Sequence, residues 1–492
     1  MASTTGLQVA TNQADVVAAA PTIDAAAARR QRLLEGPILG TILRLAAPTL
    51  VGSLAQIIAG IVQMHFVGLL GVDALAGVTL VFPCLTLMQL VASGGIGAGV
   101  ASAIARSLGA GRKADAEALL LNAVFLAIIF GIAFTAVELL LGPILYRLLG
   151  GTGSVLAASL DYSNRVFAVS IFVWLLSLLI SALVGCGNTT IPQIVAVLAL
   201  VIVVPLSPML MFGWGPMPPL GVAGAGLAFA CYYLIGAAAL LCYFRSRHAP
   251  LRLSLDIRLI ERRHLRDILK VGGLSSLSAA IPTLNVTLIT AAIARFGTET
   301  VAGYGLAVRA DYLLLPLYIG ICVGVLPMVG VSVGAAQFRR ARQIAWTGAL
   351  VAGSIGAIAA LFLALVPSAW VGLFNHDPAV VASSSLYFRI VGIQFPLSAA
   401  AVVLGAAAQG AGRPFWPFVA VITRLIIAAG GSWLVVAGMD GSILVLYAVL
   451  AMGGICYFGV MIAAHLSGRI IPPPLPDPGE RTTDRPASAG GS

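Results

Sequence analysis

Among the ionisable residues inside long apolar stretches of the chain are Asp311, Arg389 and Arg424. Charged side chains are costly in an apolar environment, so those that occur there pair with one another or mark a path for ions. A carboxylate at such a position can bind and release H⁺ or Na⁺, and a nearby arginine can interact with its charge. We therefore predict an ion-coupling site at Asp311 with Arg389 or Arg424. The alternative is a permanent ion pair that only fastens helices together.

Aromatic and amide side chains with helical spacing could line a pocket for an organic compound. Tyr304 and Tyr318 each lie seven residues from Asp311, so the three share one helix face, and aromatic faces attract cations. Gln56 and Gln63 are also seven residues apart. Their amides could bind a compound or only a neighbouring helix. Such tyrosines are more often packing residues, so both interpretations stay open.

Arginine also recurs at depth in the apolar stretches, at Arg165, Arg309, Arg389 and Arg424. Arg309 is two residues from Asp311 and points to a nearly opposite face of the helix, so it is not the direct partner of Asp311. We include Arg309 among the candidate pocket residues. Together, the four arginines leave open a wide cationic cavity.

The composition shows what must position these residues. Of 492 residues, 60% are hydrophobic and 9% are charged, whereas soluble domains are about 25% charged. A soluble enzyme, a secreted disulfide scaffold and a disordered protein are therefore excluded. The chain has twelve apolar runs that are long enough for a spanning helix of about 20 residues. They predict an all-α polytopic membrane protein with 12 transmembrane helices. The sequence has no nucleotide-binding or hydrolase motif and no paired metal ligands, so we expect no enzyme activity and no metal.

The basic residues predict how the chain is oriented. If the N-terminus is cytoplasmic, 22 Lys and Arg residues fall in the inner segments and two, Arg147 and Arg295, in the outer loops. Such an asymmetry places both termini in the cytoplasm. The net charge of +10 is then a consequence of topology, and we expect no nucleic-acid partner.

The two halves of the chain repeat one another. Residues 107–116 (SLGAGRKADA) align with 332–341 (SVGAAQFRRA) at an offset of 225, and Gly187 and Pro192 align with Gly412 and Pro417 at the same offset. Each half has six spans, so the copies share one orientation, as in transporters with parallel repeats. We expect two pseudo-symmetric six-helix lobes in a parallel repeat.

The predicted organisation has five parts. They are a disordered cytoplasmic tail (1–36), an N-lobe (37–244), a cytoplasmic linker (245–267), a C-lobe (268–468) and a disordered cytoplasmic tail (469–492). Pro-rich sequence after Ile471 prevents regular packing of the second tail.

These pieces resemble the MATE (multidrug and toxic compound extrusion) family of bacterial transporters. The resemblance covers about residues 36–468, and its most specific pieces are residues 66–71 (FVGLLG), 105–116 (ARSLGAGRKADA), 185–192 (GCGNTTIP) and 301–311 (VAGYGLAVRAD). It implies a monomeric antiporter in the bacterial inner membrane. Such a protein exports amphipathic, often cationic, small molecules by alternating access, in contact with membrane lipid and with H⁺ or Na⁺ in place of any cofactor.

The chain departs from the family pattern where the resemblance implies coupling. The family often has an aspartate in the first helix and another in the fifth, four residues after an asparagine. Here these positions hold Gln63, Ser207 and Val203, respectively. A lipid-linked oligosaccharide flippase of related architecture and a degenerate, uncoupled homologue are the alternative functions.

Overall fold

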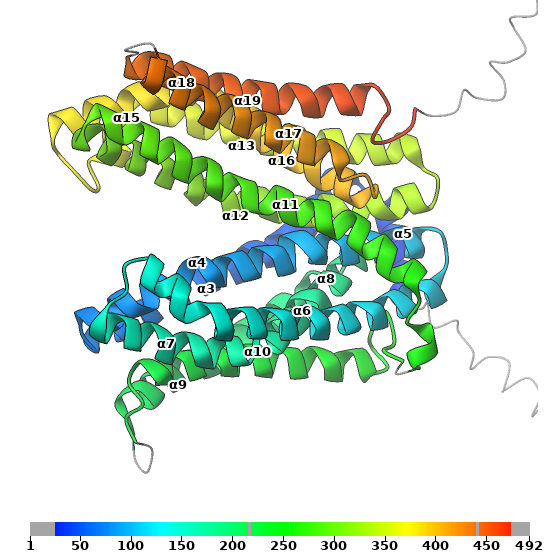
Figure 1. Ribbon diagram of the computed structural model, residues 1–492. Coiled ribbons are helices and arrows are strands. Elements are labelled where there is room, and N and C mark those ends of the chain that lie inside the picture. Colours follow the sequence, from blue (N-terminus) through cyan, green and yellow to red (C-terminus); the bar gives the residue numbers. More distant parts are fainter. Residues whose placement is uncertain (1–24, 215–217, 255, 439–441, 474–492) are drawn as a thin grey trace, which may run out of the picture.

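The computed structural model describes residues 25–214, 218–254, 256–438 and 442–473. Within these ranges the chain forms helices and no strands, and the helices lie in two groups that converge toward one side of the view (Figure 1). Sequence colours assign the lower group in that view to the first half of the chain and the upper group to the second half. The expected division into two helical lobes is therefore confirmed.

The N-lobe is built from six helical segments. They are α3 (Ile38–Leu69), α4 (Val72–Leu90) continuing through the π-helix η1 (Val91–Gly97) into α5 (Ala98–Gly109), α6 (Lys113–Leu148), α7 (Gly153–Ala168) followed by α8 (Ser170–Gly185), α9 (Thr190–Phe212) and α10 (Val222–Arg245).

The C-lobe repeats this order. Its segments are α11 (Arg262–Ile293) ending in the short η3 (Ala294–Phe296), α12 (Thr298–Gly334), α13 (Phe338–Leu365) with the short α14 (Pro367–Val371), α15 (Pro378–Val391) followed by α16 (Gln394–Gly410), α17 (Phe415–Leu425) continuing through the π-helix η4 (Ile426–Gly430) into α18 (Gly431–Gly438), and α19 (Ile443–Leu466).

The described residues hold ten helices that are long and apolar enough to cross a membrane, and twelve when each bent pair counts as one span. The bent pairs are α7 with α8, at 51°, and α15 with α16, at 56°. They occupy the fourth position of each lobe. The twelve predicted spans are thus confirmed, and the bend is itself part of the repeat.

Turn geometry confirms the repeat at individual residues. Gly187 and Gly412, 225 residues apart, both adopt a positive φ, 68° and 75°. Gly111 has φ 76°, and Ala336 at the same offset has φ 58°. A left-handed backbone costs a non-glycine residue about 1–2 kcal/mol, so the second lobe keeps this turn despite the loss of its glycine.

The predicted disorder of the tails is wrong for their described parts. Residues Ala25–Glu35 form helix α2, because Arg30 donates hydrogen bonds to the carbonyls of Leu108 and Gly109 and Leu33 is buried. Residues 469–473 pack on the C-lobe, with Ile471 also buried. The remainder of both tails, including most of the Pro-rich segment, lies outside the described residues.

The linker is shorter than predicted at its second end, because residues 262–267 belong to α11. Between α10 and α11 the described chain holds one short 3₁₀ helix, η2 (Ile257–Leu259), which the Asp256 carboxylate caps by accepting a hydrogen bond from the Arg258 amide.

Candidate functional site

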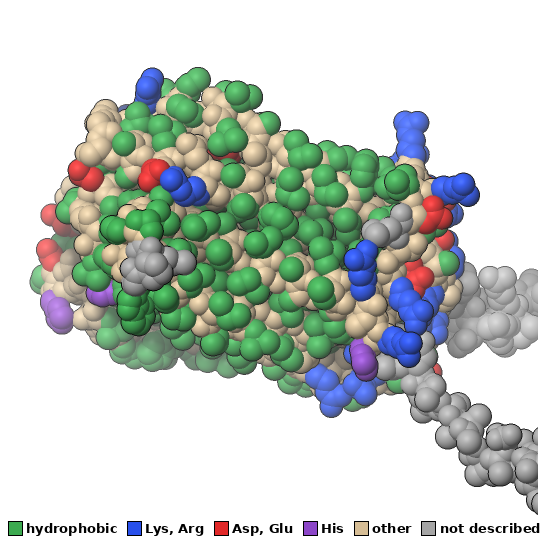
Figure 2. Space-filling model, turned by 90° about the horizontal axis from the view of Figure 1, so that it is seen from below, with side chains coloured by type: hydrophobic (Ala, Val, Ile, Leu, Met, Phe, Trp, Pro, Cys, Tyr) green, Lys and Arg blue, Asp and Glu red, His purple; other side chains and the backbone are tan. Residues whose placement is uncertain are grey.

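The two lobes meet closely at one end of the molecule, where Lys and Arg side chains gather (Figure 2). We call it the basic end: α5, α8, α12 and α16 end there, and α6, α11 and α13 begin there. Arg106 on α5 forms an ion pair of 2.7 Å with Asp267 on α11. Its second guanidinium nitrogen donates to the Ser102 hydroxyl, which in turn donates to the carbonyls of Gln409 and Gly410 on α16. One arginine thus ties α5 to two helices of the other lobe.

Glycines let the helix backbones approach at this end. A Cβ on Gly334 would collide with the Arg106 carbonyl, and one on Gly109 with the Val331 carbonyl. A Cβ on Gly324 would lie 3.0 Å from the Ile42 carbonyl on α3. Such close contact between helices is typical of membrane proteins, where small residues permit it. The basic end is therefore sealed by direct contact between the lobes.

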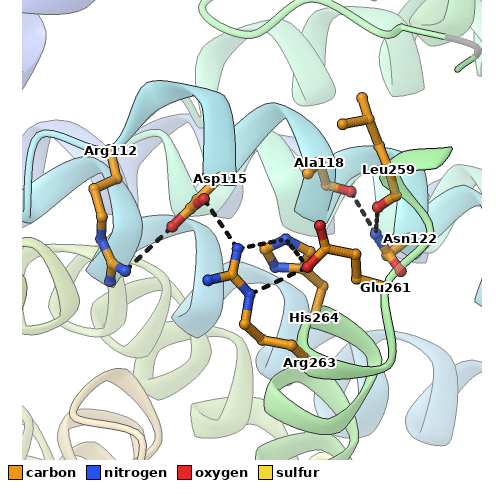
Figure 3. Close-up of polar contacts among 8 residues, drawn as sticks. All are labelled: Arg112, Asp115, Ala118, Asn122, Leu259, Glu261, Arg263 and His264. Carbon is orange, nitrogen blue, oxygen red and sulfur yellow. Dashed lines mark hydrogen bonds and ion pairs between the residues drawn. The ribbon is translucent and has the colours of Figure 1, made fainter.

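Ion pairs and hydrogen bonds also connect the linker region to the N-lobe (Figure 3). Asp115 on α6 contacts Arg112 at 3.1 Å and Arg263 on α11 at 3.4 Å. The Asn122 amide, buried in α6, donates to the carbonyl of Leu259. The beginning of α11 is therefore held against the N-lobe, although the rest of the helix belongs to the C-lobe repeat.

At the end of the molecule opposite the basic end, the face of α12 that contacts the N-lobe is uncovered. Arg309 lies eleven residues before Gly320 and 25 before Gly334, close to three and seven full turns, so all three share one face. A Cβ on Gly320 would lie 3.3 Å from Leu50 of α3, whereas one on Gly305 would have nothing within 4 Å. Arg309 is exposed. The face that packs on the N-lobe near the basic end is thus open beyond the middle of the helix.

The matching face of α3 opens in the same way. Ile42 and Leu50 pack on α12, whereas Ile57, further along the same stripe, is 47% exposed. Gly60 continues the stripe and has nothing within 4 Å of its Cβ position. The lobes therefore touch at the basic end and separate toward the opposite end, as the ribbon view also shows (Figure 1).

Asp311 faces the interior of the C-lobe. Among the described residues, no ion pair or hydrogen bond to its carboxylate is found, but the Arg424 guanidinium interacts with it electrostatically. Arg424 in turn lies 5.8 Å from the centre of the Tyr457 ring. The structure thus brings Asp311 near Arg424 without the direct bridge considered above.

Arg389 does not join this group. It is exposed on α15, five residues after Ser384, whose hydroxyl donates to the Gly303 carbonyl of α12 at 2.9 Å. Five residues turn a helix by about 140°, so Arg389 points away from α12 and from Asp311. Arg165, the remaining arginine at depth, is paired with Asp161 at 2.5 Å.

The two tyrosines of the predicted stripe are packing residues in this conformation. Tyr304 and Tyr318 are each 4% exposed. The Tyr304 ring lies 5.7 Å from that of Tyr387, edge to face, and Tyr387 lies 5.4 Å from Tyr447. The Tyr304 ring is therefore engaged by another aromatic ring, and Tyr318 is buried in the hydrophobic core of the C-lobe, so neither ring is offered to a compound.

The predicted amide pair in the N-lobe is bound to a neighbouring helix. The Gln56 amide contacts the Tyr232 hydroxyl at 3.4 Å, and Gln63 donates to the Ala225 carbonyl at 3.4 Å, both on α10. Sequence reasoning missed a shorter link of the same kind, from Gln89 on α4 to the Tyr233 hydroxyl at 2.7 Å. No periodicity could reveal that link, because it depends on how α4 and α10 cross.

At the two departures from the family pattern the N-lobe holds no acid. Val203 and Ser207 are 8% and 3% exposed, so both are buried, and the Ser207 hydroxyl lies 3.5 Å from the Met211 sulfur. Two acids remain at depth in the N-lobe. Asp161 is paired with Arg165, and Glu138 accepts a hydrogen bond of 3.2 Å from Tyr146. In the described part of the chain, no group of three or more His, Cys, Asp or Glu side chains could hold a metal ion.

Comparison with known proteins gives one consistent answer. The MatE family model matches residues 48–209 and 275–434, one match in each lobe. A protein of Shewanella oneidensis named "FAD transporter" is 26% identical over 436 residues, covering 87% of this chain and 96% of its own length. The multidrug export protein MepA of Staphylococcus aureus is 23% identical over 443 residues, covering 88% and 94%.

Solved structures agree on the fold. A MATE protein crystallised in a bent conformation superposes with a TM-score of 0.80 at 23% identity, covering 89% of this chain and 96% of the other. A MOP-superfamily transporter from Pyrococcus furiosus, described as having a binding pocket of reversed polarity, gives 0.77 at 23% identity, covering 89% and 96%. With the family model matched in both lobes, the chain belongs to the MatE family of multi-pass membrane transporters.

Proposed function

We propose that this transporter exports amphipathic organic compounds in exchange for H⁺ or Na⁺, by alternating access between its two lobes. The single observation that supports the exchange most strongly is the environment of Asp311. Of the three acids at depth, Asp161 is paired with Arg165 and Glu138 accepts a hydrogen bond from Tyr146. Asp311 has neither kind of contact among the described residues, and its one cationic neighbour is Arg424.

The exchange would work through the charge of this carboxylate. With no cation bound, the Asp311 carboxylate and the Arg424 guanidinium attract each other across the C-lobe interior. Binding of H⁺ or Na⁺ at Asp311 weakens that attraction and frees α12 to move relative to α17. Because α12 carries the face on which the lobes touch, such a shift can reach the lobe boundary. Arg389 has no place in this mechanism, since it faces away from α12.

We place the protein in the bacterial inner membrane as a monomer, with both termini and the basic end in the cytoplasm. The support is the unequal distribution of Lys and Arg between the predicted loops. In this orientation the structure is open to the outside and sealed toward the cytoplasm, with membrane lipid around both lobes.

Gradient-driven exchange in proteoliposomes tests the proposal. A pH gradient and then a Na⁺ gradient drive a set of fluorescent organic compounds in wild type, Asp311→Asn and Glu138→Gln. The proposal expects exchange in wild type and in Glu138→Gln, and loss of exchange in Asp311→Asn with compound binding retained. Normal exchange by Asp311→Asn removes Asp311 from the mechanism. If wild type exchanges nothing with either ion, the flippase and uncoupled alternatives replace the antiporter.

The Shewanella relative adds one class of compounds to this set. Because that protein is named a FAD transporter, flavin nucleotides belong beside the organic cations expected for a multidrug exporter. Exchange of flavin nucleotides but not of drugs would make this chain a nucleotide exporter within the same proposal.

A further inference from the structure

Arg309 is the one charge that faces the opening between the lobes at depth. Four helical segments meet across the lobe boundary, namely α3, the run from α4 to α5, α11 and α12, and all four are described in full. More than nine residues from their ends they carry two charged side chains, Arg309 and Asp311. Asp311 points into the C-lobe. The opening is therefore cationic on its C-lobe side.

The stripe of α3 that faces the opening offers no carboxylate to Arg309. It consists of the exposed Ile57 and Gly60 and the half-buried Ser53 and Met64, with the exposed Gln56 at its edge. No hydrogen bond or ion pair of the Arg309 guanidinium is found within the described residues, and the side chain is exposed. While the opening is wet, water satisfies the guanidinium and this arrangement carries little cost.

Closing the opening changes that balance. Alternating access must bring the outer halves of α3 and α12 together, as Ile42 and Gly324 now are near the basic end. Arg309 would then face a neutral, largely apolar surface. Burial of a charge without its partner is strongly unfavourable. An anionic group that enters with the compound, and is carried with it, removes that cost.

We propose that the transported compounds carry an anionic group, a phosphate or a carboxylate, which the Arg309 guanidinium receives in the opening between the lobes. The inference rests on the proposed function, because it supplies the substrate class for the same transport cycle. An anionic substrate also replaces the cationic one that the shared helix face of Tyr304 and Tyr318 suggested, since both tyrosines are packed against other side chains. An amphipathic ring system then meets the apolar surface of α3 around Ile57, and the anion meets Arg309.

Two flavins that differ by one phosphate test this directly. Binding of flavin mononucleotide and of riboflavin to the purified full-length transporter is measured by flavin fluorescence, with ethidium as a cation. Charge-assisted hydrogen bonds contribute about 1.5–3 kcal/mol, so we expect the mononucleotide to bind about tenfold tighter or more than riboflavin in wild type. Arg309→Gln should abolish this ratio, and Arg309→Lys should keep part of it.

The matched control is Arg389→Gln, which removes an arginine equally far from the start of its helix but facing away from α12. It should keep the full ratio. The inference is overturned if wild type binds ethidium but does not distinguish the flavins, or if both arginine variants lower the ratio equally. It is also overturned if Arg309→Gln weakens both flavins alike in a way that depends on anionic lipid, because the anion is then a headgroup.

Failure of this inference differs from failure of the proposed function. The flavin ratio is measured at equilibrium without gradients, whereas ion coupling is measured by exchange in proteoliposomes. A transporter that exchanges ethidium for H⁺ or Na⁺ and shows no flavin ratio would keep the proposed function and reject the anionic substrate. A transporter with an Arg309-dependent flavin ratio but no ion exchange would keep the anionic substrate and reject the ion-coupled exchange.

Discussion

Arg106 on α5 and Asp267 on α11 form a 2.7 Å ion pair between the sequence halves of the transporter. The same arginine holds the Ser102 hydroxyl, which reaches the carbonyl ends of α16. These contacts must break for the basic end to open. The pair therefore stabilises the conformation that is closed at the basic end.

Asp267→Asn should raise the population that is open at the basic end. Because Asp267 is 45% exposed, the pair contributes about 0.2–1 kcal/mol, so we expect this population to rise by about fivefold at most. Pulsed EPR between spin labels at Ala114→Cys and Arg339→Cys, one per lobe, reports the distance. The six native cysteines are first replaced by serine. Asp161→Asn breaks a pair within α7 and is the control. An unchanged distance distribution would show that the Arg106–Asp267 ion pair does not keep the basic end closed.

Gly334→Ala tests the backbone contact itself. The new methyl group would meet the Arg106 carbonyl, and overpacking of this kind costs about 1–3 kcal/mol. We expect a lower Tm in detergent than for wild type. Gly459→Ala on α19 is the matched control, because its Cβ has open space and alanine favours a helix by about 0.5–1 kcal/mol. Equal Tm values for the two variants would contradict the close contact at Gly334.

Arg30→Ala should release α2 from the basic end. The arginine donates to the Leu108 and Gly109 carbonyls at 2.8 Å each, and Arg340 on α13 holds the other end of α2 through the Leu33 carbonyl. Without Arg30 we expect faster tryptic cleavage within residues 25–35, followed by mass spectrometry. Gln31→Ala removes only a hydrogen bond within α2 and should leave the rate unchanged. Equal rates for both variants would show that α2 is held by other contacts.

The fold could be predicted almost completely from the sequence, because bilayer thickness fixes the length of each apolar run. The bends of the fourth and tenth spans could not, since each bent pair is apolar enough to count as one span and the chain turns within it, near Val169 and Gly392. Helix α2 was also missed. Its stability comes from carbonyl groups at the end of α5, about 80 residues away, and no local pattern in an Ala-rich tail records such a partner.

The candidate site was predicted only in part. Asp311 and Arg424 are near one another as expected, because membrane depth can be estimated from helix position. Arg389 lies at a comparable depth but on the wrong face of α15, and the direction of a side chain depends on how helices cross. For the same reason the sequence could not tell that Tyr304 is covered by Tyr387 while Arg309 is left facing the opening.

The most direct test of the account is the ion flux that a compound drives without any imposed gradient. When an exchangeable compound is added to one side of wild-type proteoliposomes, the account predicts movement of H⁺ or Na⁺ in the opposite direction. Asp311→Asn should bind the compound and move no ion, and Glu138→Gln should behave as wild type. Compound-driven ion movement that persists in Asp311→Asn would contradict coupling through the C-lobe.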